Sequence, residues 1–124
     1  MFEWMTGNAY AMQATFYAGN ITLNNPSANR LKDYAWCMIG FDEEEKKIAI
    51  KGISKETIEN NLVPLENLNR ISFGKGYARI SNKFAVDKTS TILNRSCVNE
   101  KFSVSYDEKE KMLIIDLNDL KEKK

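Results

Sequence analysis

The chain has 124 residues, of which 43% are apolar and 28% are charged, and its 18 basic and 17 acidic residues leave a formal net charge of +1. This length and composition are typical of one globular domain and exclude a disordered chain. The near-neutral charge selects no class of partner. The sequence contains no histidine, which excludes catalytic dyads and metal sites built on imidazole.

The N-terminal residues predict neither a secretory signal nor a membrane anchor. Residues 1–7 contain no basic side chain, and Glu3 interrupts their apolar run. No apolar stretch of the sequence approaches the roughly 18 residues needed to span a bilayer. We therefore expect a cytoplasmic protein without membrane contact.

The first half of the chain predicts two short strands, a helix and a hairpin, in that order. Residues 14–23 alternate between polar and apolar side chains, with a break at Gly19-Asn20. Asn25 and Pro26 are typical of a helix start, because the Asn side chain caps free amides and Pro lacks an N–H that would have no partner there. The expected helix, strand, acidic turn and returning strand cover residues 27–34, 35–41, 42–46 and 47–53.

The second half repeats this order, which predicts an internal duplication. Residues 16–25 align with 73–82, and residues 41–50 align with 106–115. A longer polar stretch, residues 89–100, separates the two matched blocks in the second half. We therefore expect one strand-rich α+β domain, made of two diverged strand–loop–strand–helix–hairpin repeats packed about a pseudo-twofold axis. Its parts are repeat one (about 14–53), a connector (about 54–69), repeat two (about 70–117) and a frayed tail (118–124).

The same alternation predicts which side chains are buried. The expected core consists of Phe16, Leu23, Leu31, Trp36, Met38, Ile48, Ile50, Phe73, Ile80, Phe102, Val104 and Ile114. Cys37 lies in an apolar run and is expected to be buried, whereas Cys97 lies in a polar stretch and is expected to be a half-exposed loop thiol. Without a secretory signal, a structural disulfide between them is not expected.

The order of strand, Gly turn, strand, short helix and hairpin resembles the swapped-hairpin family of AbrB, MazE and MraZ. The matching residues are Gly19, Ile21, Leu23 and Leu31 in the first half and Gly76, Arg79 and Ile80 in the second. This chain has Asn24 and Ser81 where that family has a Pro after its strand, and Asn20 and Tyr77 where it has an Arg after its turn. The resemblance implies an interleaved fold and DNA binding. The chain is also similar to some uncharacterised bacterial proteins, which implies no function.

No catalytic or cofactor site is expected. The acidic side chains fall in hairpin turns, where they supply turn propensity and solubility rather than desolvated acid–base pairs. Gly74-Lys75-Gly76 lacks the remainder of a phosphate-loop pattern and is interpreted as a tight turn. Trp4, Trp36 and Tyr34 have the chemistry to stack on bases, although the apolar setting of Trp36 favours the core. We expect a protein that is not an enzyme.

Two functional classes remain open from the sequence. In the first, basic side chains of the turn–strand–helix segments bind duplex DNA through its phosphates: Arg30, Lys32, Lys75, Arg79 and Lys83. In the second, the chain is a protein–protein interaction module, antitoxin-like or regulatory, that binds no nucleic acid. Simple solvation of these surface side chains is the competing interpretation. Either class is compatible with a monomer or a homodimer.

Overall fold

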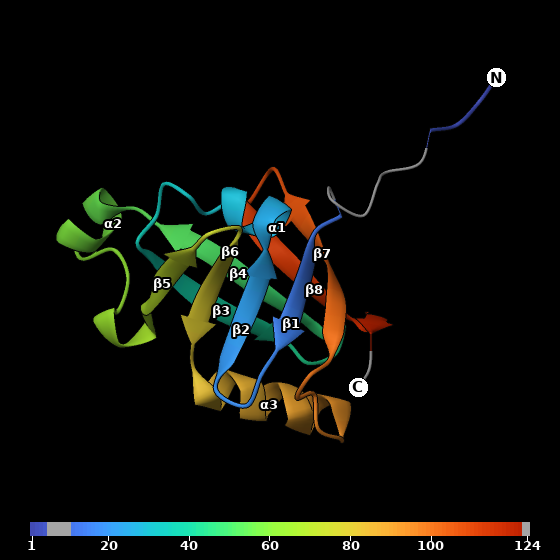
Figure 1. Ribbon diagram of the computed structural model, residues 1–124. Coiled ribbons are helices and arrows are strands. Elements are labelled where there is room, and N and C mark those ends of the chain that lie inside the picture. Colours follow the sequence, from blue (N-terminus) through green and yellow to red (C-terminus); the bar gives the residue numbers. More distant parts are fainter. Residues whose placement is uncertain (5–10, 123–124) are drawn as a thin grey trace.

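The computed structural model describes residues 1–4 and 11–122, and its strands form one closed antiparallel barrel (Figure 1). In ring order the strands are β1 (Gln13–Phe16), β2 (Asn20–Asn24), β6 (Tyr77–Ser81), β5 (Asn69–Gly74), β3 (Trp36–Asp42), β4 (Lys47–Ile53), β8 (Met112–Glu122) and β7 (Lys101–Asp107). Within the described residues, no helix is both long enough and apolar enough to cross a membrane.

The expected α+β class is wrong, because the strands hydrogen-bond into a continuous ring and the helices are short additions to it. The pairs β2 with β6 and β4 with β8 join the two halves of the chain, and β1 with β7 completes the ring. Alternation along a strand identifies which residues face inward, but it carries no information about distant strand partners. The sequence therefore predicts the strands but does not predict that they close into a ring. The helices are α1 (Asn25–Asn29), α2 (Lys55–Glu59) and α3 (Lys83–Leu93), together with the 3-10 helix η2 (Leu65–Asn67).

Helices α1 and α3 lie at opposite ends of the barrel (Figure 1). The N-cap of α1 is Asn24 rather than the expected Asn25. Its side-chain oxygen accepts hydrogen bonds from the Ser27 N–H at 3.4 Å and the Gln13 N–H at 3.0 Å. The helix ends at Asn29, so the expected helix over residues 27–34 is wrong. Helix α3 follows the expected course, and Asn82 caps it by accepting from the Ala85 N–H at 2.9 Å.

Inward-facing apolar side chains fill the barrel, and most of the expected core is confirmed. Four positions are wrong: Trp36, Met38 and Ile114 are half-buried, and Phe73 is 46% exposed. The neighbours Leu113 and Ile115 face the core in place of Ile114. Confirmed as buried are Phe16, Leu23, Leu31, Ile48, Ile50, Ile80, Phe102 and Val104.

The two cysteines are both free and both buried. The predicted burial of Cys37 is confirmed. The prediction that Cys97 is a half-exposed loop thiol is wrong, because its polar sequence neighbours fold over it and exclude solvent. Burial raises the pKa of the Cys37 thiol to about 12 and raises the pKa of the Cys97 thiol as well.

Candidate nucleic-acid interface

Four neighbouring pairs in the ring consist of strands that no hairpin joins: β1 with β7, β2 with β6, β3 with β5 and β4 with β8. We call the first of these pairs the closed seam and the third the open seam. The closed seam consists of β1, β7 and the loop 94–100 that leads into β7. The open seam consists of β3, β5 and the loop 30–35 that leads into β3. The two seams occupy corresponding places in the order of elements, since in each a loop after a helix leads into the strand that pairs across it.

The loop of the closed seam is bonded to β1 at both of its last two residues. The Phe16 N–H donates to the Glu100 carbonyl at 2.9 Å, and the Asn99 N–H donates to the Phe16 carbonyl at 2.7 Å. These bonds continue the pairing of β1 with the chain just before β7 begins, and the loop covers Phe16 completely. The Phe16 side chain is 0% exposed and packs edge-on against Phe102, with 5.5 Å between ring centroids.

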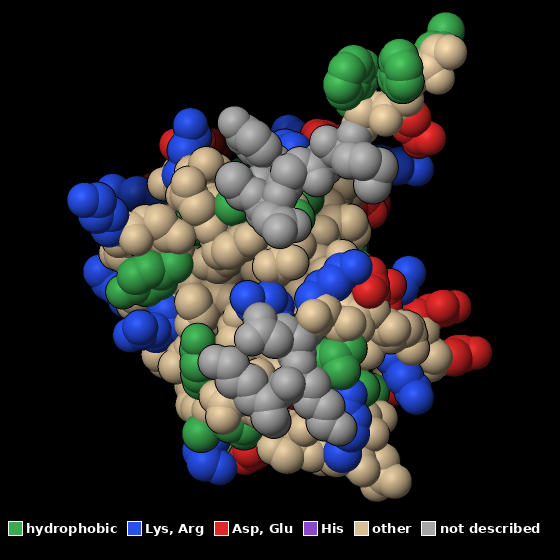
Figure 2. Space-filling view, turned by 45° about the vertical axis from the view of Figure 1, so that its right-hand side comes forward, with side chains coloured by type: hydrophobic (Ala, Val, Ile, Leu, Met, Phe, Trp, Pro, Cys, Tyr) green, Lys and Arg blue, Asp and Glu red, His purple; other side chains and the backbone are tan. Residues whose placement is uncertain are grey.

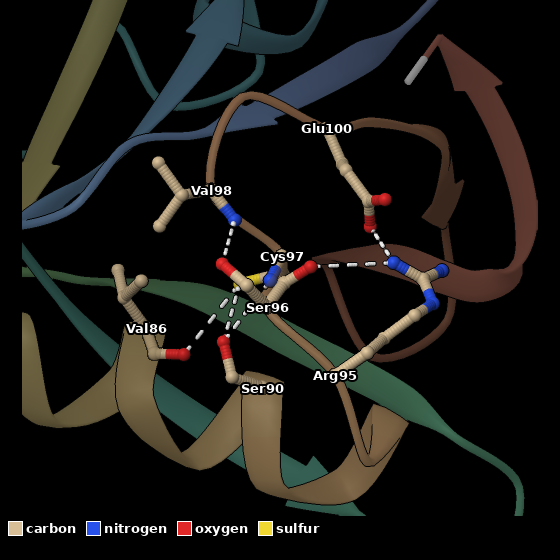
Figure 3. A network of polar contacts seen from close by, with 7 residues as sticks. All are labelled: Val86, Ser90, Arg95, Ser96, Cys97, Val98 and Glu100. Carbon is tan, nitrogen blue, oxygen red and sulfur yellow. Dashed lines mark hydrogen bonds and ion pairs between the residues drawn. The ribbon is translucent and has the colours of Figure 1, made fainter. Parts of the chain in front are cut away.

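A polar network inside the same loop fixes its shape (Figure 3). The Cys97 N–H donates to the Ser90 hydroxyl at 3.1 Å, and that hydroxyl donates to Cys97 Sγ at 3.3 Å. Arg95 forms an ion pair with Glu100, whose carboxylate is 2% exposed. A buried carboxylate is tolerated only when it is paired and hydrogen-bonded, so Arg95 is necessary for the loop to close as it does.

The open seam is bonded over a much shorter length. Strands β3 and β5 are in register at only two pairs, Trp36 with Arg70 and Cys37 with Asn69. One further bond joins the Ile71 N–H to the Ala35 carbonyl at 2.9 Å. The loop thus meets β5 two residues before Phe73 and leaves that ring 46% exposed.

A groove follows the open seam beyond this last bond. Its volume is about 550 Å³, and residues 32–35 of the loop and 70–73 of β5 line it. The lining combines two cations, Lys32 and Arg70, with the rings of Tyr34 and Phe73 and the hydroxyl of Ser72. Asp33 is the one carboxylate among these residues. The groove is therefore mainly cationic and aromatic.

Two more cations belong to the hairpin that carries the groove. Arg79 on β6 lies opposite Ser72 in the register, and Lys75 lies in the turn that joins β5 to β6. Tyr77 supports this hairpin, because its ring lies across Gly74 and the Arg79 guanidinium is 5.4 Å from the ring centroid. We call Lys32, Arg70, Lys75 and Arg79 the basic surface. Within residues 1–4 and 11–122, none of the four is in an ion pair.

The structure brings together three of the five side chains expected from the sequence: Lys32, Lys75 and Arg79. Arg30 is engaged elsewhere, 3.5 Å from the Glu108 carboxylate and 4.4 Å from the Tyr106 ring centroid. Lys83 begins α3 at the other end of the barrel and pairs with Asp87 at 2.8 Å. These two side chains are separate from the basic surface.

Sequence reasoning missed Arg70, although a signal for it exists. Lys75-Gly76 forms the two-residue turn of the β5–β6 hairpin, and Gly76 adopts a φ of +83° that favours glycine. This turn sets Gly74 opposite Tyr77 and Ser72 opposite Arg79. Since Ile71 faces the core, Arg70 must face outward on the same side as Arg79.

Charge is distributed unevenly over the barrel. Strands β1, β2, β5 and β6 contain no Asp or Glu, whereas seven of the 17 acidic residues fall at the β3–β4 and β7–β8 turns, at positions 42–45, 107, 108 and 110. Figure 2 shows mainly Lys and Arg among the charged side chains at the left edge of the view, whereas Asp and Glu lie mostly toward its right, where further Lys and Arg side chains also lie. Two members of the basic surface, Arg70 and Arg79, therefore lie on strands that contain no carboxylate side chain.

The described residues contain no group of three or more metal-ligating side chains. Comparison of the chain with protein-family models, curated proteins and solved structures found no match. The resemblance to the swapped-hairpin family, drawn from short motifs, stays a prediction.

Proposed function

We propose that this protein binds nucleic acid, with duplex DNA as the first form to test, and that the basic surface makes the contact. The observation that carries the proposal is the placement of Arg70 and Arg79 on paired strands without carboxylates, with Lys32 at the groove and Lys75 in the turn between those strands. Side chains of this kind bind phosphates by charge and by counterion release, without regard to sequence.

The salt dependence of binding tests this proposal. If about four phosphates are neutralised, the affinity for duplex DNA falls roughly 100-fold between about 50 and 200 mM salt. Fluorescence anisotropy with a labelled duplex at several salt concentrations measures both the affinity and the slope. Absence of binding at the lowest salt concentration, to this duplex and to a single strand of the same length, contradicts the proposal.

A matched pair of variants locates the contact. Arg70→Gln with Arg79→Gln removes two charges from the basic surface, so it weakens binding and reduces the salt slope by about two. Lys47→Gln with Lys109→Gln removes the same charge from exposed positions at the start of β4 and in the β7–β8 turn. If the control pair reduces the slope as much as the first pair, binding reflects net charge and does not use the basic surface.

The open seam also supports a second candidate, a protein–protein interaction module. Strand β5 pairs with β3 at only two positions, so part of its edge is open to a strand from another protein. Backbone pairing of this kind depends weakly on salt. Co-purification of a protein that resists high salt, without binding to DNA, favours this second function.

A further inference from the structure

We infer that the groove of the open seam accepts an unpaired nucleobase, which stacks on Phe73 while Lys32 and Arg70 contact the adjoining phosphates. This inference rests on the proposed function and narrows it, because it predicts a preference for single-stranded nucleic acid over a duplex.

The first step concerns the position of Phe73. Strand β5 places Phe73 opposite Ala78, which is fully buried, so the alternation directs this ring toward the inner side of the barrel. The ring is nevertheless 46% exposed, because the loop 30–35 stops short of it. An aromatic ring held by a strand and open on one side is a ready stacking platform, since every base has a π-face.

The second step concerns what surrounds the ring. The groove has a volume of about 550 Å³ and is lined by Lys32 from the loop and Arg70 from β5, together with Phe73. Arg70 is held in place, since its guanidinium lies 5.8 Å from the centroid of the Trp36 ring. Arg70 faces the outer side of β5 and Phe73 the inner side, so the groove that both line follows the edge of the strand. Cations and an aromatic ring along one strand edge match the alternation of phosphate and base along a single strand.

The third step separates single strands from duplexes. In a duplex both faces of each base are covered by its neighbours, so Phe73 meets only base edges or phosphates. Unpaired bases turn outward and stack on aromatic side chains at little cost. The groove therefore adds affinity only when a base is free to enter it.

The experiment compares three ligands of equal length, about 12 nucleotides, a length within the range of strand that small barrels bind. They are a labelled thymidine strand, the same strand with every base removed, and a duplex. We expect the thymidine strand to bind about tenfold more tightly than the abasic strand. Phe73→Leu abolishes this difference and leaves the abasic strand's affinity unchanged, whereas Phe73→Tyr preserves it.

The outcomes distinguish failure of the inference from failure of the proposed function. No binding to any of the three ligands at low salt overturns both. Equal binding of the thymidine and abasic strands, or tighter binding of the duplex, overturns the inference alone. A Phe73→Leu variant that weakens all three ligands equally also overturns it, because the ring would then support the fold of the surface and not stack on a base.

Discussion

The closed and open seams are built at corresponding places in the barrel, yet one is sealed and the other is not. Phe16 and Phe73 each stand near the end of a strand that pairs across a seam. The first is fully buried under the loop 94–100, and the second is half exposed beside the loop 30–35. The difference comes from the contacts of the connecting chain: the loop 94–100 carries a buried carboxylate paired with Arg95 and a buried thiol, and the loop 30–35 carries Lys32 at its surface. The contacts that the loop makes thus decide whether a seam is sealed or forms a groove.

The largest expected effect concerns the two phenylalanines. Phe16→Ala should reduce the free energy of unfolding by about 3–5 kcal/mol, because it leaves a cavity against Phe102 in the sealed core. Phe73→Ala should reduce it by about 1 kcal/mol or less, since the ring already contacts water. Urea denaturation of both variants makes the measurement. Equal losses would mean that the two seams are packed alike.

A smaller loss is expected when the ion pair of the closed seam is broken. Arg95→Met leaves the buried Glu100 carboxylate without its partner and should destabilise the protein by about 2–3 kcal/mol. Adding Glu100→Gln removes the uncompensated charge and should restore part of the stability. If the double variant is less stable than Arg95→Met alone, the loss in Arg95→Met does not come from the uncompensated charge of Glu100.

The pH dependence of stability tests whether the open seam is dry beneath its groove. Cys37 lies on β3 at this seam, and burial raises its pKa from 9.0 to about 12. Between these values the unfolded chain releases the proton and the folded chain keeps it. The free energy of unfolding therefore falls by about 1.4 kcal/mol per pH unit from this thiol, and below pH 9.0 its contribution is complete. The free energy of unfolding, measured by denaturation at about pH 8 and about pH 10, should fall less in Cys37→Ala than in the wild-type protein. An equal fall in the two proteins would mean that Cys37 contacts water.

The smallest effect is expected for the cations of the basic surface. Arg79→Gln should change the free energy of unfolding by no more than about 0.5 kcal/mol, because the side chain is exposed and in no ion pair with a described residue. Thermal unfolding of this variant beside Arg95→Met compares an arginine of the basic surface with an arginine of the closed seam. A large loss in Arg79→Gln would assign it a structural role.

The sequence allowed most strands and α3 to be predicted, because the strands depend on alternation and α3 follows from the repeated order of elements. Ring closure could not be predicted, since the pairing of Gln13 with Ser103 or of Lys47 with Asp116 leaves no local trace. The burial of Cys97 and Glu100 was missed for a related reason: both lie in a polar stretch, and only a loop folded on itself buries them. For the candidate site, Lys32, Lys75 and Arg79 were identified, but the separation of Arg30 and Lys83 depends on their carboxylate partners. The internal duplication itself stays a prediction.

The pairing of β1 with β7 has a consequence for how the protein is made. Gln13 of β1 is opposite Ser103 of β7, so during synthesis β1 leaves the ribosome several seconds before the strand with which it pairs. Through that interval the edge of β1 has no partner on that side, and the apolar side chains of Phe16 and Ile21 have no complete core to enter. Such a barrel closes only after β7 has been made rather than from its N-terminus onward, and it is exposed to aggregation until then.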